Sequence, residues 1–400
     1  MSAFLTRILR KPQVRHLIAI DLGSHAAVRS LLFNVDEEGR DPRVVAKRNL
    51  ELPIRDEAKA LIPLIASHLR RLIFQYVKEL GRIPDEILIG LGSQFIVNDR
   101  ERATFTRQDP SRALTVGELH SLLTEHLNHR DTVRVGPETY HRFIVIPFKI
   151  ELDGYPLETL NAESRGKTVT IHLFNTYATA SFLSELTALR SMVGGLTVNF
   201  ISNIAAIAGG VVSILNLEDA LVVKIGAKMT EVILLRSGVI ASAGQFASGG
   251  EAVTEAFSRA LSISFSDAER LKREMATALM GNHTQAAVRA ALGEAAERWR
   301  QGLAEFLDES ETLVLPETIF LLGGGARLEA LKQTLAAGSW FEAFTFQPRL
   351  NIVRLDAKEF ARAIFRTSPP PLAGPEEVAL ASLAGRLIQR PATITPQPGP

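Results

Sequence analysis

A strand–turn–strand unit occurs twice in the chain, and this repetition limits the possible folds more than any other feature. The first copy is "HLIAIDLGSHAAVRSLLFNV" at residues 16–35, and the second is "ALVVKIGAKMTEVILLRSGVI" at residues 220–240. Each is a pair of β-prone runs joined by a turn that contains glycine. Because the copies are separated by helical and further strand patterns, we expect a duplicated two-lobe α/β architecture.

The composition is that of an ordinary globular protein. The chain has 400 residues, enough for two or more domains with well-developed cores. Lys plus Arg number 45 against 44 Asp plus Glu, so charge gives no argument for nucleic acid or for bulk attraction to a membrane. The absence of cysteine excludes disulfides and cysteine-based zinc sites, and it is compatible with a reducing cytoplasm.

The two ends of the chain differ in character. No apolar run is long enough to span a bilayer, and the start lacks the apolar region of a secretory signal. "FLTRILRK" at residues 4–11 predicts a short basic amphipathic helix, which either docks on the domain or contacts the inner face of the cell membrane through residues 1–12. We favour docking, because so short a helix is marginal in water. The Pro-rich end, residues 391–400, predicts a disordered tail.

The first candidate anion site is "AIDLGSH" at residues 19–25. A strand ends at Asp21, Gly23 allows close backbone approach, and the N–H groups of Ser24 and His25 can form a phosphate nest. Asp21 is a candidate ligand of Mg²⁺ through water. The alternative is an ordinary β-turn, in which Asp, Gly and Ser are common.

The second candidate is "LLGGGARL" at residues 321–328. Gly323, Gly324, Gly325 and the following Ala326 stand between an apolar strand and a helix. Removing every Cβ at the turn allows a phosphate or a flat group to pack closely at a helix N-terminus. The alternative is a tight strand-to-helix turn, but three glycines are costly to order, which favours a ligand.

The third candidate is "KIGAKMTE" at residues 224–231, the turn of the second strand–turn–strand unit. Gly226 allows a tight turn, and Lys228 either points at phosphate or is a solvated turn lysine. Gly249 and Gly250 then precede a helix, and they either cap that helix or line a cleft.

The order of these motifs resembles that of the actin-like ATPase superfamily. "AIDLGS" is similar to its phosphate-1 loop, "KIGAKMTE" to its phosphate-2 loop, and "IFLLGGGARLEAL" to its adenosine motif. The resemblance implies a cleft for ATP and Mg²⁺ between two lobes. It also implies nucleotide contacts for Lys224 and Thr230, and for Glu269 and Lys272 on the predicted helix "SFSDAERLKREM".

The segment between the two units narrows the resemblance. "SQFIVNDRERATF", a helix, "YHRFIVIPFKIELDGYPLE" and "RGKTVTIHLFN" are similar to the SHS2 insertion of the bacterial cell division protein FtsA; the pilus protein PilM shares the fold and the insertion. The implied domains are a tail (1–15), lobe I (16–92, completed by 375–390), an SHS2-like insertion (93–192) and lobe II (193–368).

The sequence departs from the superfamily pattern in the two loops that resemble the phosphate-binding loops. Lys224 stands where members usually carry Asp, Ala227 and Lys228 replace glycines, and Ala26 replaces a lysine that touches phosphate. Losing the carboxylate that helps to hold Mg²⁺ removes part of what phosphoryl transfer requires. We therefore expect weak or absent ATP hydrolysis. Lys224 is expected to neutralise phosphates, to take the place of the divalent cation, or to pair with Asp21 across an empty cleft.

These observations support two functions. The first is an FtsA-like protein that self-associates and links FtsZ filaments, through their C-terminal peptide, to the membrane. The second is a PilM-like scaffold that binds the tail of a membrane protein by strand addition. A small-molecule kinase ranks last, because no acid is placed as a general base at the phosphate-2 turn. The Pro-rich C-terminus also cannot form the amphipathic membrane helix usual in FtsA.

Overall fold

The computed structural model describes residues 14–23, 27–36, 41–51, 58–127, 131–157, 159–192, 196–274, 281–309, 314–337, 344–346, 350–367 and 370–389. The predicted amphipathic tail up to residue 13, the C-terminal tail 391–400, and Ser24, His25 and Ala26 lie outside these residues. No helix in the described part of the chain is long and apolar enough to cross a membrane.

The first lobe is built on a five-stranded sheet. Its strands are β1 (Arg15–Leu22), β2 (Ala27–Val35), β3 (Arg43–Glu51), β4 (Glu86–Leu91) and β10 (Thr197–Ser202). The order is β10-β4-β1-β2-β3: the first three strands form an antiparallel meander, and β4 and β10 are added in parallel.

The second lobe repeats this topology. Its strands are β11 (Ala220–Ile225), β12 (Thr230–Arg236), β13 (Val239–Phe246), β15 (Thr318–Leu322) and β17 (Asn351–Arg354), in the order β13-β12-β11-β15-β17. Again three antiparallel strands are followed by two parallel ones. All six residues of β11 are buried, as expected for a central strand covered on both faces. The predicted duplicated two-lobe α/β architecture is confirmed.

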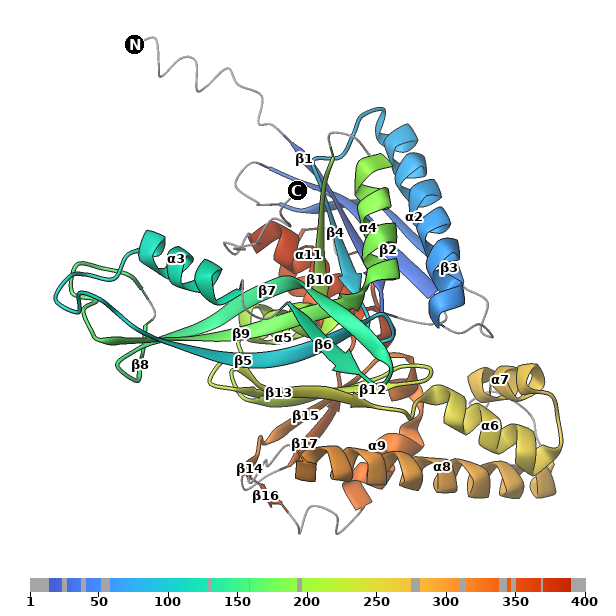
Figure 1. Cartoon of the computed structure of the whole chain (residues 1–400). Helices are drawn as coiled ribbons and strands as arrows, with labels where there is room; N and C mark the ends of the chain where they lie inside the picture. The colour runs from blue at the N-terminus through green and yellow to red at the C-terminus, as the bar shows by residue number, and fades with distance from the viewer. Residues whose placement is uncertain are drawn as a thin grey trace.

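Helices cover both sheets (Figure 1). In the first lobe, α2 (Ala58–Leu80) and α4 (Ala180–Met192) pack together on one face. In the second lobe, the outer face carries α6 (Gly250–Leu261), α7 (Phe265–Glu274), α8 (Asn282–Glu309) and α9 (Glu329–Ala337). Between the sheets lie α5 (Asn203–Ile214), α10 (Ala357–Ile364) and α11 (Val378–Gln389), whose side chains join both lobes in one continuous core.

An inserted β-sheet domain projects to the left in Figure 1. It consists of β5 (Ile96–Thr106), α3 (Val116–Leu127), β6 (Thr132–Val135), β7 (Glu138–Leu152), β8 (Tyr155–Pro156) and β9 (Thr168–Thr179), with the antiparallel order β5-β9-β7-β6 and β8 added to β7. Helix α3 buries Leu119 and Leu123 against this sheet. Thr115 caps this helix, because its Oγ1 accepts a hydrogen bond of 3.1 Å from the N–H of Glu118.

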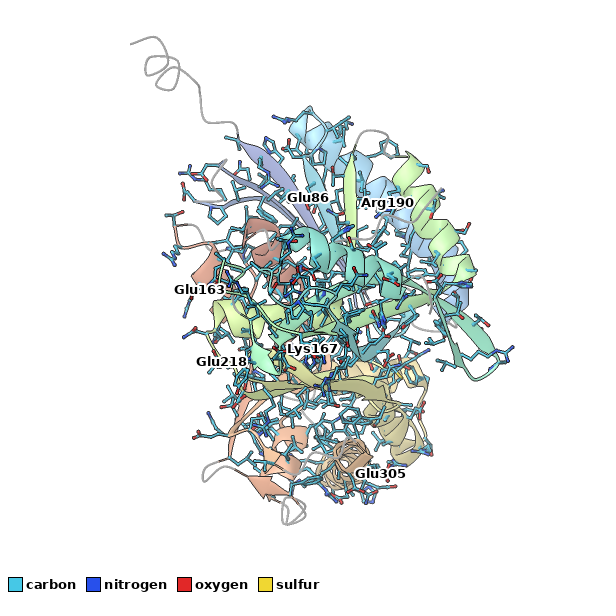
Figure 2. The ribbon with its side chains drawn as sticks, turned by 60° about the vertical axis from the view of Figure 1, so that its left-hand side comes forward. Glu86, Glu163, Lys167, Arg190, Glu218 and Glu305 are labelled. Atoms are coloured by element: carbon cyan, nitrogen blue, oxygen red, sulfur yellow. The ribbon has the colours of Figure 1, made fainter. Side chains whose placement is uncertain are left out.

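The structure corrects the predicted boundaries around the insertion. The sequence assigned residues up to 192 to the insertion and began lobe II at 193, but β10 pairs with β4 and α4 packs on α2. Figure 2 labels two residues that hold β10 in the first lobe. Glu86 accepts a hydrogen bond from Asn199, and Arg190 of α4 donates to the carbonyl of Val198. Residues 180–202 therefore belong to the first lobe.

Candidate nucleotide cleft between the lobes

The three predicted glycine turns meet around the end of β11. Lys224 Nζ donates to the carbonyl of Gly23 over 3.3 Å. The turn at Gly323–Gly325 lies against Ile225: a Cβ at Gly323 would be 2.5 Å from the Ile225 carbonyl oxygen. Gly323 also has φ +85°, which favours glycine. A Cβ at Gly324 would meet nothing within 4 Å, so this glycine faces open space.

Asp21 is buried beside Gly23, and its carboxylate is fully engaged. Its Oδ1 accepts hydrogen bonds of 2.7 Å from the N–H of Gly23 and from Asn203 Nδ2. Its Oδ2 lies 3.8 Å from a guanidinium nitrogen of Arg29. The structure thus brings Asp21 and Gly23 close to Lys224 at the end of β11.

Lys224 forms an ion pair with Glu231, not with Asp21. The two residues are direct partners across the β11–β12 hairpin, and 8% of Lys224 and 4% of Glu231 is exposed. The register explains the correction, because a carboxylate directly opposite the lysine is closer than Asp21, whose own partners are Gly23, Arg29 and Asn203. Sequence reasoning missed Glu231, although its opposite charge across a short hairpin was a usable signal.

The second carboxylate oxygen of Glu231 reaches the other lobe. Glu231 Oε1 accepts hydrogen bonds from the N–H of Ser93, over 3.2 Å, and from the Ser93 hydroxyl. Ser93 lies two residues after the end of β4, so the pair of Lys224 and Glu231 connects the lobes at Gly23 and at Ser93. The charged groups at the end of β11 are therefore paired with other protein groups.

The carboxylates of Asp21 and Glu231 are poorly suited as ligands for Mg²⁺. Asp21 is partnered by Arg29 and Glu231 by Lys224, so neither carboxylate offers the uncompensated charge that hard cations select. Among the described residues, no group of three His, Cys, Asp or Glu side chains is placed to hold a metal ion. We therefore derive no chemical step through Mg²⁺.

The turn after β11 caps the following helix. The carbonyl oxygens of Gly226 and Ala227 accept hydrogen bonds from the N–H groups of Gly250 (2.9 Å) and Glu251 (2.8 Å) at the start of α6. A Cβ at Gly249 would lie 2.5 Å from the Ala227 carbonyl oxygen. Of the two roles considered for Gly249 and Gly250, the geometry supports helix capping, since these N–H groups already have protein acceptors.

Lys228 stands in the same turn beside an acid. Burial raises the pKa of Glu251, and the nearby ammonium groups of Lys228 and Lys272 act against that rise. The positive charge of Lys228 thus acts against the cost of burying a carboxylate at the start of α6.

Thr230 belongs to the core of the second lobe. It is fully buried, its hydroxyl donates to the carbonyl of Ser248 over 2.6 Å, and it accepts from Trp299 Nε1 over 2.9 Å. Both hydrogen-bonding roles of the hydroxyl are occupied, so this geometry does not support the predicted nucleotide contact.

Glu269 and Lys272 join α7 to the start of α6. Lys272 Nζ donates to Glu269 and to the carbonyl of Gly250 over 2.9 Å. Burial lowers the pKa of Lys272. Burial raises the pKa of Glu269, but hydrogen bonds from Lys272 and Thr254 outweigh it and leave that pKa below its usual value. The predicted pair is thus present near the cleft, with its groups satisfied by protein.

The adenosine-like turn continues as a short helix, η1 (Gly324–Arg327), in which Ala326 is buried. The N–H of Gly323 donates to the carbonyl of Pro375, and Arg327 forms an ion pair of 2.9 Å with Glu376. The segment that leads into α11 therefore packs behind this turn.

Comparison with known proteins identifies the fold. No protein-family model and no curated protein sequence matches the chain. The solved structure of a PilM–PilN type IV pilus biogenesis complex is similar over 93% of this chain and 98% of the other, with a TM-score of 0.56 and 18% identity. That identity shows the fold alone.

Two further solved structures are similar at lower scores. They are diol dehydratase-reactivating factor in nucleotide-free form (94% of this chain, 100% of the other, TM-score 0.49, 10% identity) and EutJ from Carboxydothermus hydrogenoformans (94%, 90%, 0.46, 13%). Neither adds to the argument at these scores. Together, the repeated sheet topology and the PilM likeness show that the chain has the two-lobe actin-like ATPase fold, interrupted by an inserted β-sheet domain.

Proposed function

We propose that the chain is a scaffold of the actin-like fold that does not hydrolyse ATP and binds an extended segment of a protein partner through its insertion. The observation that supports this proposal most directly is the buried ion pair of Lys224 and Glu231 at the end of β11. Phosphoryl transfer is achieved almost entirely by positioning and by charge stabilisation from metal ions and donors. Here a cation stands at the expected acid position, and the neighbouring carboxylate is committed to it.

The partner is proposed from the PilM likeness. The PilM structure is that of a complex with PilN, and the similarity extends over nearly the whole of both chains, the insertion included. We assign residues 96–179 as an SHS2-like domain on this basis. Strand addition to an open sheet edge is a common way in which such domains capture an extended peptide.

A peptide-binding experiment tests this function. The full chain is incubated with immobilised tail peptides of a PilN-type pilus protein and, separately, with the C-terminal peptide of FtsZ. We expect retention on the first and not on the second. Retention on the FtsZ peptide alone would favour the cell-division role, and retention on neither would overturn the proposed partner class.

Nucleotide binding is measured in parallel. We expect that any affinity for ATP is unchanged when Mg²⁺ is omitted, because neither Asp21 nor Glu231 offers a free carboxylate for the metal. An affinity that depends strongly on Mg²⁺ would contradict this part of the proposal. Sedimentation with anionic liposomes, with and without residues 1–12, tests the peripheral membrane contact that the N-terminal segment suggests.

A further inference from the structure

A cavity of about 450 Å³ lies where the insertion meets both lobes. Its walls come from β7 of the insertion, from α5, from the β12–β13 hairpin and from α11. The lining is mainly apolar, with Ile146, Phe148, Val212 and Ile240 among its residues. No acidic side chain lines it.

One charged group, Arg386 of α11, lines this cavity. Its guanidinium makes no hydrogen bond or ion pair with any residue that the structure describes, and burial lowers its pKa. Glu218, labelled in Figure 2, has an exposed side chain whose Cγ would lie 3.9 Å from a Cβ at Gly238, and it does not line the cavity. A partly buried arginine without a carboxylate partner is uncommon, because the cost of desolvation is not offset.

Strand β7 presents an open edge at the same place. On the side away from β9, β6 pairs with residues 138–141 and β8 with residues 151–152. On that side, no described strand pairs with residues 143–149, although β9 pairs with this stretch on the other side. Ile146, Pro147 and Phe148 of this stretch line the cavity. An exposed edge is a template for an added strand, and Pro147 keeps it from pairing indiscriminately.

We propose that this cavity seats an extended aliphatic segment of a partner protein, in which one carboxylate pairs with Arg386. The inference rests on the partner-binding role proposed above and adds the location and the required chemistry. The apolar walls select aliphatic side chains, the β7 edge selects an extended backbone, and the unpartnered guanidinium selects an anion by charge complementarity.

The test uses the full chain and two synthetic libraries of random octapeptides, one with free and one with amidated C-termini. We expect the enriched peptides to combine aliphatic residues with one carboxylate. Enrichment in both libraries assigns the carboxylate to Asp or Glu, whereas enrichment in the free library alone assigns it to the chain end. Enriched peptides without either carboxylate would overturn the inference.

Substitutions at two positions, Arg386 and Gly209, locate the binding. Arg386→Gln is expected to lower the affinity for the enriched peptides at least about tenfold, whereas Arg386→Lys should retain part of that affinity. Gly209→Leu fills the cavity from α5, where a Cβ would come no closer than 4.0 Å to Arg386. Because Gly209 lies within a helix, a larger residue there is not expected to impair folding. Arg298→Gln, at an exposed position of α8, is the control.

The outcomes separate this inference from the proposed function. Peptides that bind equally to Arg386→Gln, Gly209→Leu and the parent chain would place the partner elsewhere, leaving the partner-binding role intact. If no peptide is enriched and no pilus-type tail is retained, both proposals fail.

Discussion

Lys224 and Glu231 face each other across the β11–β12 hairpin, and Glu231 extends their connection to Ser93 of the other lobe. In a buried ion pair, each charge offsets the desolvation cost of the other, and either charge alone would be costly to bury. It also stands at the turn that the proposed function assigns to a former nucleotide site. The same contact that joins the lobes therefore accounts for the expected loss of catalysis.

Breaking the pair from one side should strongly destabilise the protein. Lys224→Met or Glu231→Gln alone is expected to lower the free energy of unfolding by about 3–5 kcal/mol, because a buried charge is left uncompensated. The double variant should cost much less than the sum. Urea unfolding of the three variants measures this coupling, and purely additive effects would show that the pair does not act as a unit.

The connection to Ser93 should contribute separately. Ser93→Ala removes the hydroxyl donor to Glu231 and is expected to cost about 1–2 kcal/mol, with a lower thermal midpoint. Ser121→Ala is the matched control, because that hydroxyl is exposed and binds only within α3. Equal midpoints for the two variants would show that the Ser93 contact does not stabilise the lobe arrangement.

The adenosine-like turn offers a comparison of adjacent glycines. Gly323→Ala should destabilise by about 2 kcal/mol or more, because φ is positive and a Cβ would meet the Ile225 backbone. Gly324→Ala should be neutral or slightly stabilising, since nothing lies within 4 Å of its Cβ position. Chemical denaturation distinguishes them, and a reversed order would contradict the geometry described for this turn.

Glu269 should make the stability of the folded protein depend on pH. Its pKa is lowered in the folded protein, so its contribution is fully present above the unfolded value of about 4.5 and is lost as the pH falls through the folded value. Glu269→Gln should therefore cost about 2 kcal/mol near neutrality and less at pH 3, where the parent has lost the same contribution. Urea midpoints between pH 7 and pH 3 measure the difference, which should stay constant if Glu269 carries no such linkage.

Much of the fold was predictable because local signals agreed with it. The repeated strand–turn–strand units mark β1–β2 and β11–β12, and the glycine turns at Gly23 and Gly323–Gly325 indicate where the chain bends toward a cleft. These features depend on backbone conformation and on hydrophobic patterning within a few residues.

The missed features depend on contacts between distant segments. The apolar strand at 197–202 fits either sheet by pattern, and only its parallel pairing with β4 assigns it to the first lobe. Ser93 meets Glu231 across 138 residues, and Asn203 meets Asp21 across 182. Arg386 is an unremarkable helical residue in the sequence, and only the packing of α11 against α5 and the insertion isolates its charge.

Steady-state hydrolysis of ATP by the unmodified chain, with Mg²⁺ present, tests the central claim most directly. The buried pair of Lys224 and Glu231 predicts a phosphate release rate that is indistinguishable from a protein-free blank. Turnover at about 1 per second or faster, the usual range of enzymes, would contradict the account.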